Sequence, residues 1–286
     1  MNRTKTTIPR LPPMTKRQFY RTLRGIRDPF IICDDVETWP AWSKWSFDWL
    51  REQHGDIEVP VEWLRYSRRP GQSAIRVGRV KNMTLAEYVD SLSSDEPGDK
   101  GYVIGPDILK RIPALLGDIR FPNYHDHERL VERIAFIGDA GTYTQLHYDR
   151  AHNLHAVFTG RKRWQLYAPN RGRQLRPVNL SFVWSIVSEL DLAPEGGRFE
   201  DVSGDAEALP GGVAPDFDIV LEAGEMLFLP YGWWHRVITL EPSIAVNYWW
   251  WPLDLVARRA PFILPSLVFS RIQERLRPPV RRGYYG

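Results

Sequence analysis

From about residue 131 the sequence is a succession of short, strand-like runs separated by turn residues. Regularly spaced short strands with turn signals between them are typical of an all-β barrel or sandwich. A polar, glycine-rich insertion at 170–216 interrupts the succession. We therefore predict a mainly β core over residues 131–252. Its expected strands cover residues 133–139, 142–149, 153–160, 162–169, 218–230, 235–240 and 243–251.

The flanking segments differ from this core. Residues 1–14 are polar and rich in proline, so we expect a flexible arm there. Residues 15–130 mix helical and extended patterns, and residues 253–286 form a tail of helical segments broken by prolines. We predict one domain spanning 1–286, in which both flanks are extensions of the β core. In the N-terminal extension we expect helices at 14–25, 46–56, 83–92 and 106–119 (interrupted at Pro113), extended runs at 29–36 and 57–66, and a loop at 93–101.

Composition narrows the class of protein. The 286 residues include one cysteine, which excludes an internal disulfide framework and a cysteine-based zinc site. A net charge of +3 is too small to argue for nucleic acid, and no stretch has the length of a membrane span. No apolar segment typical of a signal peptide follows the first residues. We expect a soluble, cytoplasmic protein with no membrane or nucleic-acid partner.

One candidate site stands out in the stretch TYTQLHYDRAHNLHAVFTGRKRWQLY, residues 142–167. His147 and Asp149 lie two apart on an expected strand, so their side chains share a face. His235, after the run LFLPYGWW, is a candidate third ligand. Two histidines and one carboxylate make the facial triad that holds non-haem Fe(II). The pattern alone also allows a proton-transfer pair or a polar strand face.

Several motifs in order resemble the JmjC/cupin-like family of Fe(II)- and 2-oxoglutarate-dependent oxygenases. The likeness is greatest to the subgroup of the asparaginyl hydroxylase that acts on hypoxia-inducible factor. It covers roughly residues 28–251. The motifs are TQLHYD (144–149), Asn153, GRK (160–162), GEMLFLPYGWWH (224–235) and VNYW (246–249), with DPFIICDDVETWPAWSKWSFDWLREQHGD (28–56) and MTLAEYV (83–89) before them.

The resemblance implies roles for single residues. His147, Asp149 and His235 match the iron ligands, and Lys162 matches the lysine that pairs with the distal carboxylate of 2-oxoglutarate. Judged alone, a lysine in GRKR would be read as an exposed turn residue. Thr144 matches a hydroxyl that assists Lys162. Because Thr144 has the opposite strand parity to His147, this role requires a bend between them.

The resemblance also suggests roles for residues whose sequence patterns are less specific. Asn153 and Asn247 match polar residues near the co-substrate and metal, although each could be a simple turn or strand-end residue. Tyr102 is a candidate for a tyrosine that lines the same pocket. His155 is not required by the family pattern, and we interpret it as a core histidine with satisfied hydrogen bonds. The aromatic residues that could form an apolar wall, most of them expected in the core, are Trp233, Trp234, Tyr248, Trp249, Trp250 and Trp251.

The family resemblance implies a double-stranded β-helix (jelly-roll or cupin) core and a hydroxylase activity. Fe(II), 2-oxoglutarate and O₂ would be required, with succinate and CO₂ as co-products. A protein or peptide side chain, or a small molecule, would be the substrate. The alternative is a non-catalytic, metal-binding cupin-like protein. By analogy with related enzymes, the tail at 253–286 is expected to support a homodimer.

Overall fold

The computed structural model describes residues 7–67, 75–92, 100–105, 107–120, 124, 130–178, 185–188, 190, 209 and 212–252. The helices are α1 (Lys16–Gly25), α2 (Pro40–Lys44), α3 (Phe47–His54), α4 (Leu85–Ser91), α5 (Asp107–Arg111) and α6 (Leu115–Asp118), with short 3-10 turns at Val36–Thr38 and Pro169–Arg171. The strands are β1 (Arg10–Leu11), β2 (Phe30–Ile32), β3 (Glu58–Ser67), β4 (Ile75–Thr84), β5 (Lys100–Gly105), β6 (Leu130–Gly138), β7 (Tyr143–Asp149), β8 (His152–Thr159), β9 (Lys162–Tyr167), β10 (Pro177–Val178), β11 (Ser185–Ser188), β12 (Phe217–Leu221), β13 (Met226–Leu229), β14 (Trp234–Thr239) and β15 (Ser243–Trp250).

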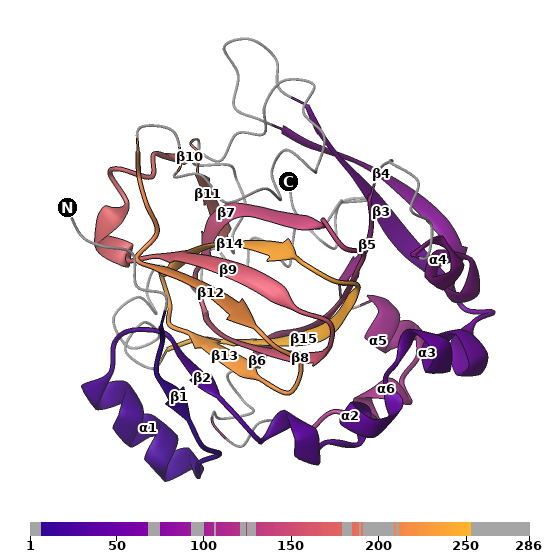
Figure 1. Cartoon of the computed structure of the whole chain (residues 1–286), viewed down its shortest axis with the longest axis horizontal. Coiled ribbons are helices and arrows are strands. Elements are labelled where there is room, and N and C mark those ends of the chain that lie inside the picture. Colours follow the sequence, from indigo (N-terminus) through magenta and orange to yellow (C-terminus); the bar gives the residue numbers. More distant parts are fainter. Residues whose placement is uncertain are drawn as a thin grey trace, which may run out of the picture.

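Two sheets face each other and enclose an interior (Figure 1). One has nine strands in the order β1-β2-β13-β8-β15-β6-β5-β3-β4, and the other has six in the order β10-β11-β7-β14-β9-β12. The chain crosses between the sheets from β7 to β8 and again from β8 to β9, and it does the same at β13, β14 and β15. This alternation is that of a jelly roll. It confirms the predicted mainly β, cupin-like fold.

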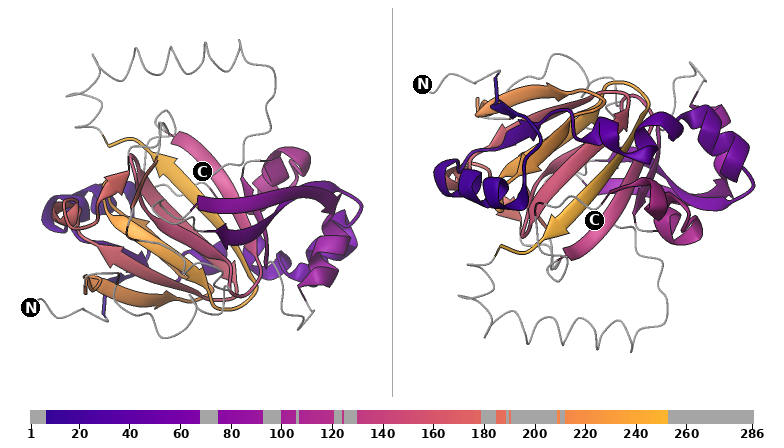
Figure 2. Two further views of the ribbon diagram at one scale, coloured as in Figure 1. Left: turned by 90° about the horizontal axis from the view of Figure 1, so that it is seen from above. Right: turned by 90° about the horizontal axis from the view of Figure 1, so that it is seen from below.

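The apolar residues form three cores, and the helices lie outside the nine-stranded sheet. Figure 1 shows α1 and α2 below β13, β15 and β8, and Figure 2 shows the sheets from two further sides. Phe19 of α1 packs on Phe30 and Phe228 of the sheet, with ring centroids 6.0 Å and 5.2 Å apart. A second core fills the space between the sheets. The third covers the outer face of the six-stranded sheet and includes Leu175 and Leu209 from the predicted insertion.

Helix boundaries in the N-terminal extension follow from capping residues. The side chains of Thr15 and Thr84 each accept a hydrogen bond from the backbone N–H of the third residue of the helix. The side chain of that third residue in turn accepts one from the backbone N–H of the cap. Ser46 caps α3. The predicted helix at 106–119 is divided at Pro113 into α5 and α6, as expected.

Two strands of this extension differ from our expectations. Strand β4 pairs with β3 along its whole length, although its polar sequence did not indicate a strand. It lies at the edge of the sheet, where polar side chains are tolerated. Strand β5 begins at Lys100, inside the segment 93–101 that we expected to be a loop.

Two more expectations need correction. Within the arm expected to be flexible, Arg10–Leu11 pair in parallel with β2, and Arg10 Nε lies 2.9 Å from Glu225 Oε1. The run 218–230 is two strands in different sheets, because the chain turns at Gly224, where φ is +89°. The tail at 253–286, with the proposed dimer contact, lies outside the described residues. Among the described residues, no helix combines the length and the hydropathy of a membrane-spanning segment.

Candidate metal and co-substrate site

Strands β7 and β14 bring the three predicted metal ligands together. His147 and His235 are directly opposite each other in the antiparallel pair. Asp149 lies two residues beyond His147, so it shares the face of both histidines. Residues far apart in the sequence therefore meet on the inner face of the six-stranded sheet.

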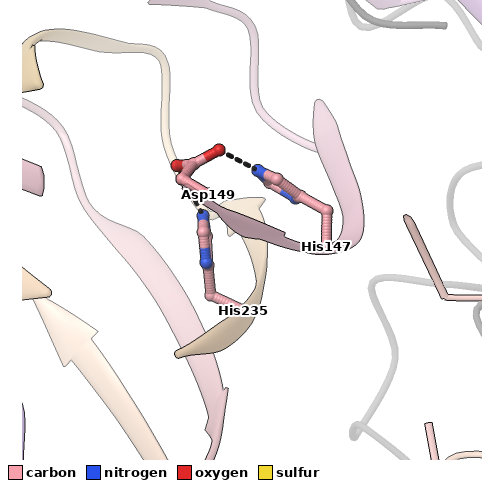
Figure 3. A group of neighbouring side chains, drawn as sticks. All are labelled: His147, Asp149 and His235. Atoms are coloured by element: carbon pink, nitrogen blue, oxygen red, sulfur yellow. Dashed lines mark ion pairs between the residues drawn. The ribbon is translucent and has the colours of Figure 1, made fainter. Parts of the chain in front are cut away.

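The ligand atoms of these side chains converge (Figure 3). Asp149 Oδ1 lies 3.7 Å from His147 Nε2, and Asp149 Oδ2 lies 3.7 Å from His235 Nε2. The two imidazole centroids are 4.1 Å apart. One ligand atom from each residue can be chosen so that all lie within 4.8 Å of one another, and all three side chains are buried. This spacing leaves room for one ion between them.

Backbone carbonyls fix the tautomer of both histidines. His147 Nδ1 donates to Gln145 O at 2.6 Å, and His235 Nδ1 donates to Trp233 O at 3.1 Å. Each Nε2 therefore carries a lone pair that faces the carboxylate. Burial, together with the neighbouring His147, lowers the pKa of His235 to about 3. The imidazole is consequently neutral, which is the form that binds a metal.

The carboxylate of Asp149 is also held in place. Ser185 Oγ donates to Oδ1 at 2.7 Å, and Trp249 Nε1 donates to Oδ2 at 3.1 Å. Ser185 lies on β11, directly opposite Asp149. This strand is part of the insertion at 170–216, in which no functional residue was expected. Such partners orient metal ligands and raise metal affinity.

The donor set fits a divalent iron. Two neutral imidazoles and one carboxylate are the ligands of non-haem Fe(II) sites that keep other positions open. The histidines and the carboxylate are oriented by hydrogen bonds to residues outside the triad.

A bulge in β7 places Thr144 on the same face as the triad. The pairing of β7 with β14 shifts register, so that His235 opposes His147 whereas Val237 opposes Thr144. Three residues of β7 thus match two of β14, and the extra residue reverses the strand parity. The bend that the predicted role of Thr144 required is present. That role stays a prediction, because the hydroxyls that contact Lys162 among the described residues are those of Tyr102 and Thr239.

Lys162 is fully buried in this interior. Its Nζ lies 3.0 Å from Thr239 Oγ1 and 3.4 Å from the Tyr102 hydroxyl. Among the residues that the structure describes, no carboxylate pairs with it. Burial lowers its pKa from 10.5 to about 7. A buried ammonium without a counter-ion is costly, so the interior is suited to an anion.

The local turn explains why Lys162 is buried although the motif GRK reads as exposed. Gly160 adopts a φ of +75°, and a Cβ there would lie 2.2 Å from Pro242 O. The turn is thus pressed against the loop between β14 and β15, and Leu240 N donates to Arg161 O at 2.9 Å. Only a glycine permits this approach, which starts β9 with the Lys162 side chain directed inward.

Lys162 and the triad share one face of the sheet. Lys162 opposes Thr239 in the pairing of β9 with β14, and His235 lies four residues before Thr239. Four residues correspond to about 13 Å along a strand. An extended lysine side chain and a five-carbon dicarboxylate can together bridge this separation.

The remaining predicted polar residues lie on the opposing inner face. His155 and Asn247 are directly opposite each other on β8 and β15, and His155 Nδ1 hydrogen-bonds Asn247 Oδ1. The amide nitrogen and oxygen of Asn153 are buried without a partner among the described residues, and so is His155 Nε2. Our interpretation of His155 as a satisfied core residue therefore holds for only one of its two nitrogens.

Comparison with known proteins identifies the family. A protein-family model described as "Cupin-like domain" matches residues 16–254. The chain belongs to the JmjC/cupin-like family. It is 27% identical over 252 residues to lysine-specific demethylase 8 of Xenopus tropicalis, with 86% of this chain and 53% of the relative covered. It is 26% identical to Jumonji C domain-containing protein 5 of Drosophila melanogaster, covering 85% of this chain and 59% of the relative.

A third relative of this JmjC/cupin-like protein has a name that refers to tRNA. The human tRNA wybutosine-synthesizing protein 5 is 28% identical over 262 residues, with 85% of this chain and 77% of the relative covered. The chain spans little more than half of the length of the first two relatives. The expected likeness to the asparaginyl hydroxylase subgroup stays a prediction.

The aromatic residues of β15 are divided between two faces of the sheet. Trp249 faces the interior and binds Asp149, whereas Tyr248 and Trp250 pack in the outer core against the helices. Trp234 belongs to the third core, outside the six-stranded sheet. Of the six aromatic residues considered for an apolar wall, Trp233 and Trp249 are buried in the interior core and Trp251 packs against it.

Proposed function

We propose that this JmjC/cupin-like protein is an Fe(II)- and 2-oxoglutarate-dependent oxygenase that hydroxylates an unactivated C–H bond. The observation that carries the proposal is the pairing of two features in one interior. A preformed two-histidine, one-carboxylate triad lies on the same sheet face as a fully buried lysine without a described carboxylate partner. A metal-binding protein without this chemistry would have no use for the lysine.

His147, Asp149 and His235 would hold the metal through Nε2, a carboxylate oxygen and Nε2. Bound Fe(II) supplies the activation of O₂, in which decarboxylation of 2-oxoglutarate to succinate and CO₂ is coupled to insertion of oxygen into a C–H bond. Lys162 would hold the distal carboxylate by a charge-assisted hydrogen bond, which is stronger than a neutral one. Tyr102 and Thr239 position the ammonium for this contact.

The substrate we propose is a side chain of a protein or peptide, with a small molecule as the second candidate. One relative is named as a lysine-specific demethylase, which is consistent with a protein substrate. Another is named as a tRNA wybutosine-synthesizing protein, so tRNA has to be included in any substrate search. The expectation of no nucleic-acid partner rested on net charge alone.

Succinate formation tests the proposed reaction. The Fe(II)-loaded protein should convert 2-oxoglutarate to succinate in air, slowly by itself and faster when a peptide library, a metabolite mixture or a tRNA pool contains the substrate. His147→Ala should abolish this conversion. The matched control is His54→Ala, at the end of α3 outside the β core, which should retain it.

The opposite result has a definite meaning. Wild-type protein that binds Fe(II) but neither binds nor consumes 2-oxoglutarate would contradict the oxygenase proposal. It would favour the alternative of a non-catalytic, metal-binding cupin-like protein.

A further inference from the structure

His155 carries a buried nitrogen that nothing described in the structure satisfies. Its side chain is on the inner face of β8, and the residue is 3% exposed. Nδ1 is used by Asn247, whereas Nε2 has no hydrogen-bond partner among the described residues. Burying a polar atom without a partner costs free energy that a phenylalanine of similar shape would not. A histidine here is therefore costly unless a ligand completes it.

The described neighbours of His155 do not supply the missing partner. The ring of Phe136 lies 5.9 Å away, and the ring of Trp164 lies edge-on at 4.9 Å. The residue opposite His155 on β13 is Leu227. These groups enclose the imidazole largely with apolar surface. The polar atom that they contribute, Trp164 Nε1, also has no hydrogen-bond partner among the described residues, and Asn247 is already engaged through its oxygen.

His155 lies between the two ends of the proposed co-substrate pocket. Trp164, which contacts it, also stacks on His235 with centroids 5.6 Å apart. Burial and then the charge of Lys162 lower the pKa of His155 to about 3, and His235 contributes in the same direction. The imidazole is thus neutral, and both the metal ligand and the lysine are close enough to act on it.

We propose that His155 is a positioning residue that donates a hydrogen bond from Nε2 to a carboxylate oxygen of the co-substrate. This inference rests on the proposed function. In the empty site, Nδ1 carries the proton and donates to the Asn247 oxygen. When the dianion binds, the amide of Asn247 turns over and its nitrogen donates to Nδ1. The proton on the ring is then at Nε2, so one proton is lost at Nδ1 and one is gained at Nε2, with no change in charge.

This arrangement has a physical advantage over a fixed cation. A carboxylate accepts hydrogen bonds only, so the lone pair of the empty-site tautomer would repel it. Rotation of one amide converts the pair His155–Asn247 from an acceptor into a donor. The co-substrate is thereby held between a charged donor, Lys162, and a neutral donor, His155.

Calorimetric titration of 2-oxoglutarate into the Zn(II)-loaded full chain provides the first test. His155→Phe keeps the ring and removes both nitrogens, so it should raise the dissociation constant about tenfold or more. Asn247→Leu should have a similar effect. Because the two residues act as a unit, the double variant should be at most about twofold weaker than either single variant. The matched control is His152→Phe, on the same strand but packed against Phe228 and Trp250, which should bind normally.

The second test uses the unaltered protein, so it does not depend on the folding of any variant. Nitrogen-15 NMR of histidine-labelled, Zn(II)-loaded protein should show the proton of His155 on Nδ1 without ligand and on Nε2 with 2-oxoglutarate. An unchanged tautomer would overturn the inference, and so would normal binding by His155→Phe. Absence of 2-oxoglutarate binding in the wild type, in contrast, would contradict the proposed function itself.

Discussion

The two ends of the interior are built on opposite principles. At the triad, Ser185 and Trp249 satisfy both carboxylate oxygens of Asp149, and backbone carbonyls hold both histidines. At the other end, the hydrogen-bond partners of the buried Lys162 ammonium among the described residues are two neutral hydroxyls. The triad is thus held in place by its own hydrogen bonds, whereas the end at Lys162 stays electrostatically incomplete. The first arrangement favours affinity and geometry, and the second reserves binding energy for one ligand at a cost in stability.

The largest effect should come from removing a ligand at the complete end. His147→Ala leaves two ligand atoms where three converged, so Fe(II) affinity should fall by more than the 10- to 100-fold that is typical of losing a supporting residue. Competition with a chromogenic chelator measures this affinity. His152→Ala, on β8 of the opposing sheet, is the control. Near-normal Fe(II) affinity of His147→Ala would show that the triad is not the metal site.

The incomplete end should respond to Lys162→Met with effects of opposite sign on binding and on stability. Methionine retains an unbranched apolar stem but no charge. Removing one member of a buried ion pair costs about 3–5 kcal/mol, so the dissociation constant of 2-oxoglutarate should rise at least about a hundredfold. The ligand-free protein should be at least as stable as the wild type, because an unpaired buried charge is gone.

Arg163→Met is the matched control for this variant. Arg163 is the next residue, pairs with Asp218 on a partly exposed face, and should change stability by no more than about 1 kcal/mol. Chemical denaturation measures both variants. A large loss of stability in ligand-free Lys162→Met would mean that the lysine is a structural residue.

The pH dependence of the free energy of unfolding should report on the buried Lys162 ammonium. Burial lowers the pKa of Lys162 from 10.5 to about 7 in the folded protein. Between these values the unfolded chain binds more protons than the folded protein, so the free energy of unfolding rises with pH. From pH 7 to pH 9, the wild type should gain about 2 kcal/mol relative to Lys162→Met. Urea denaturation at both pH values measures the difference, and parallel curves for the two proteins would contradict the assigned burial.

A smaller effect is expected from the residues that support Asp149. Trp249→Phe and Ser185→Ala each remove one hydrogen bond and leave the ligands in place. Fe(II) affinity should fall about 10- to 100-fold in each case. Trp250→Phe, one residue along the strand but on the outer face, should leave the affinity unchanged. Equal metal affinity in Trp249→Phe and the wild type would show that the triad does not depend on this support.

Local patterns in the sequence were sufficient to predict the three residues of the triad and most of the strands. His147 and Asp149 share a face because of strand geometry alone, and the motif around His235 indicated the third candidate ligand. The burial of Lys162 could not be read from its neighbours, because it depends on Gly160 meeting Pro242 from a different part of the chain. Only the family resemblance indicated a role for this lysine.

Long-range pairing explains what the sequence could not show. Ser185 and Thr239 reach the site because β11 opposes β7 and β14 opposes β9, and neither residue belongs to a recognisable pattern. The orientation of the aromatic residues on β15 follows from the parity of Asn247, which faces the interior. A two-residue period predicts that alternate residues share a face, but not which face is inside.

The central claim is that the triad and Lys162 serve one metal-bound dicarboxylate. The most direct measurement is anaerobic addition of Fe(II) and 2-oxoglutarate to the metal-free protein, followed by visible absorption. We predict the weak charge-transfer band of a chelated 2-oxo acid in the wild type, its loss in His147→Ala, and a much higher 2-oxoglutarate requirement in Lys162→Met. A folded wild-type protein without the band, or a band that is indifferent to Lys162→Met, would contradict the claim.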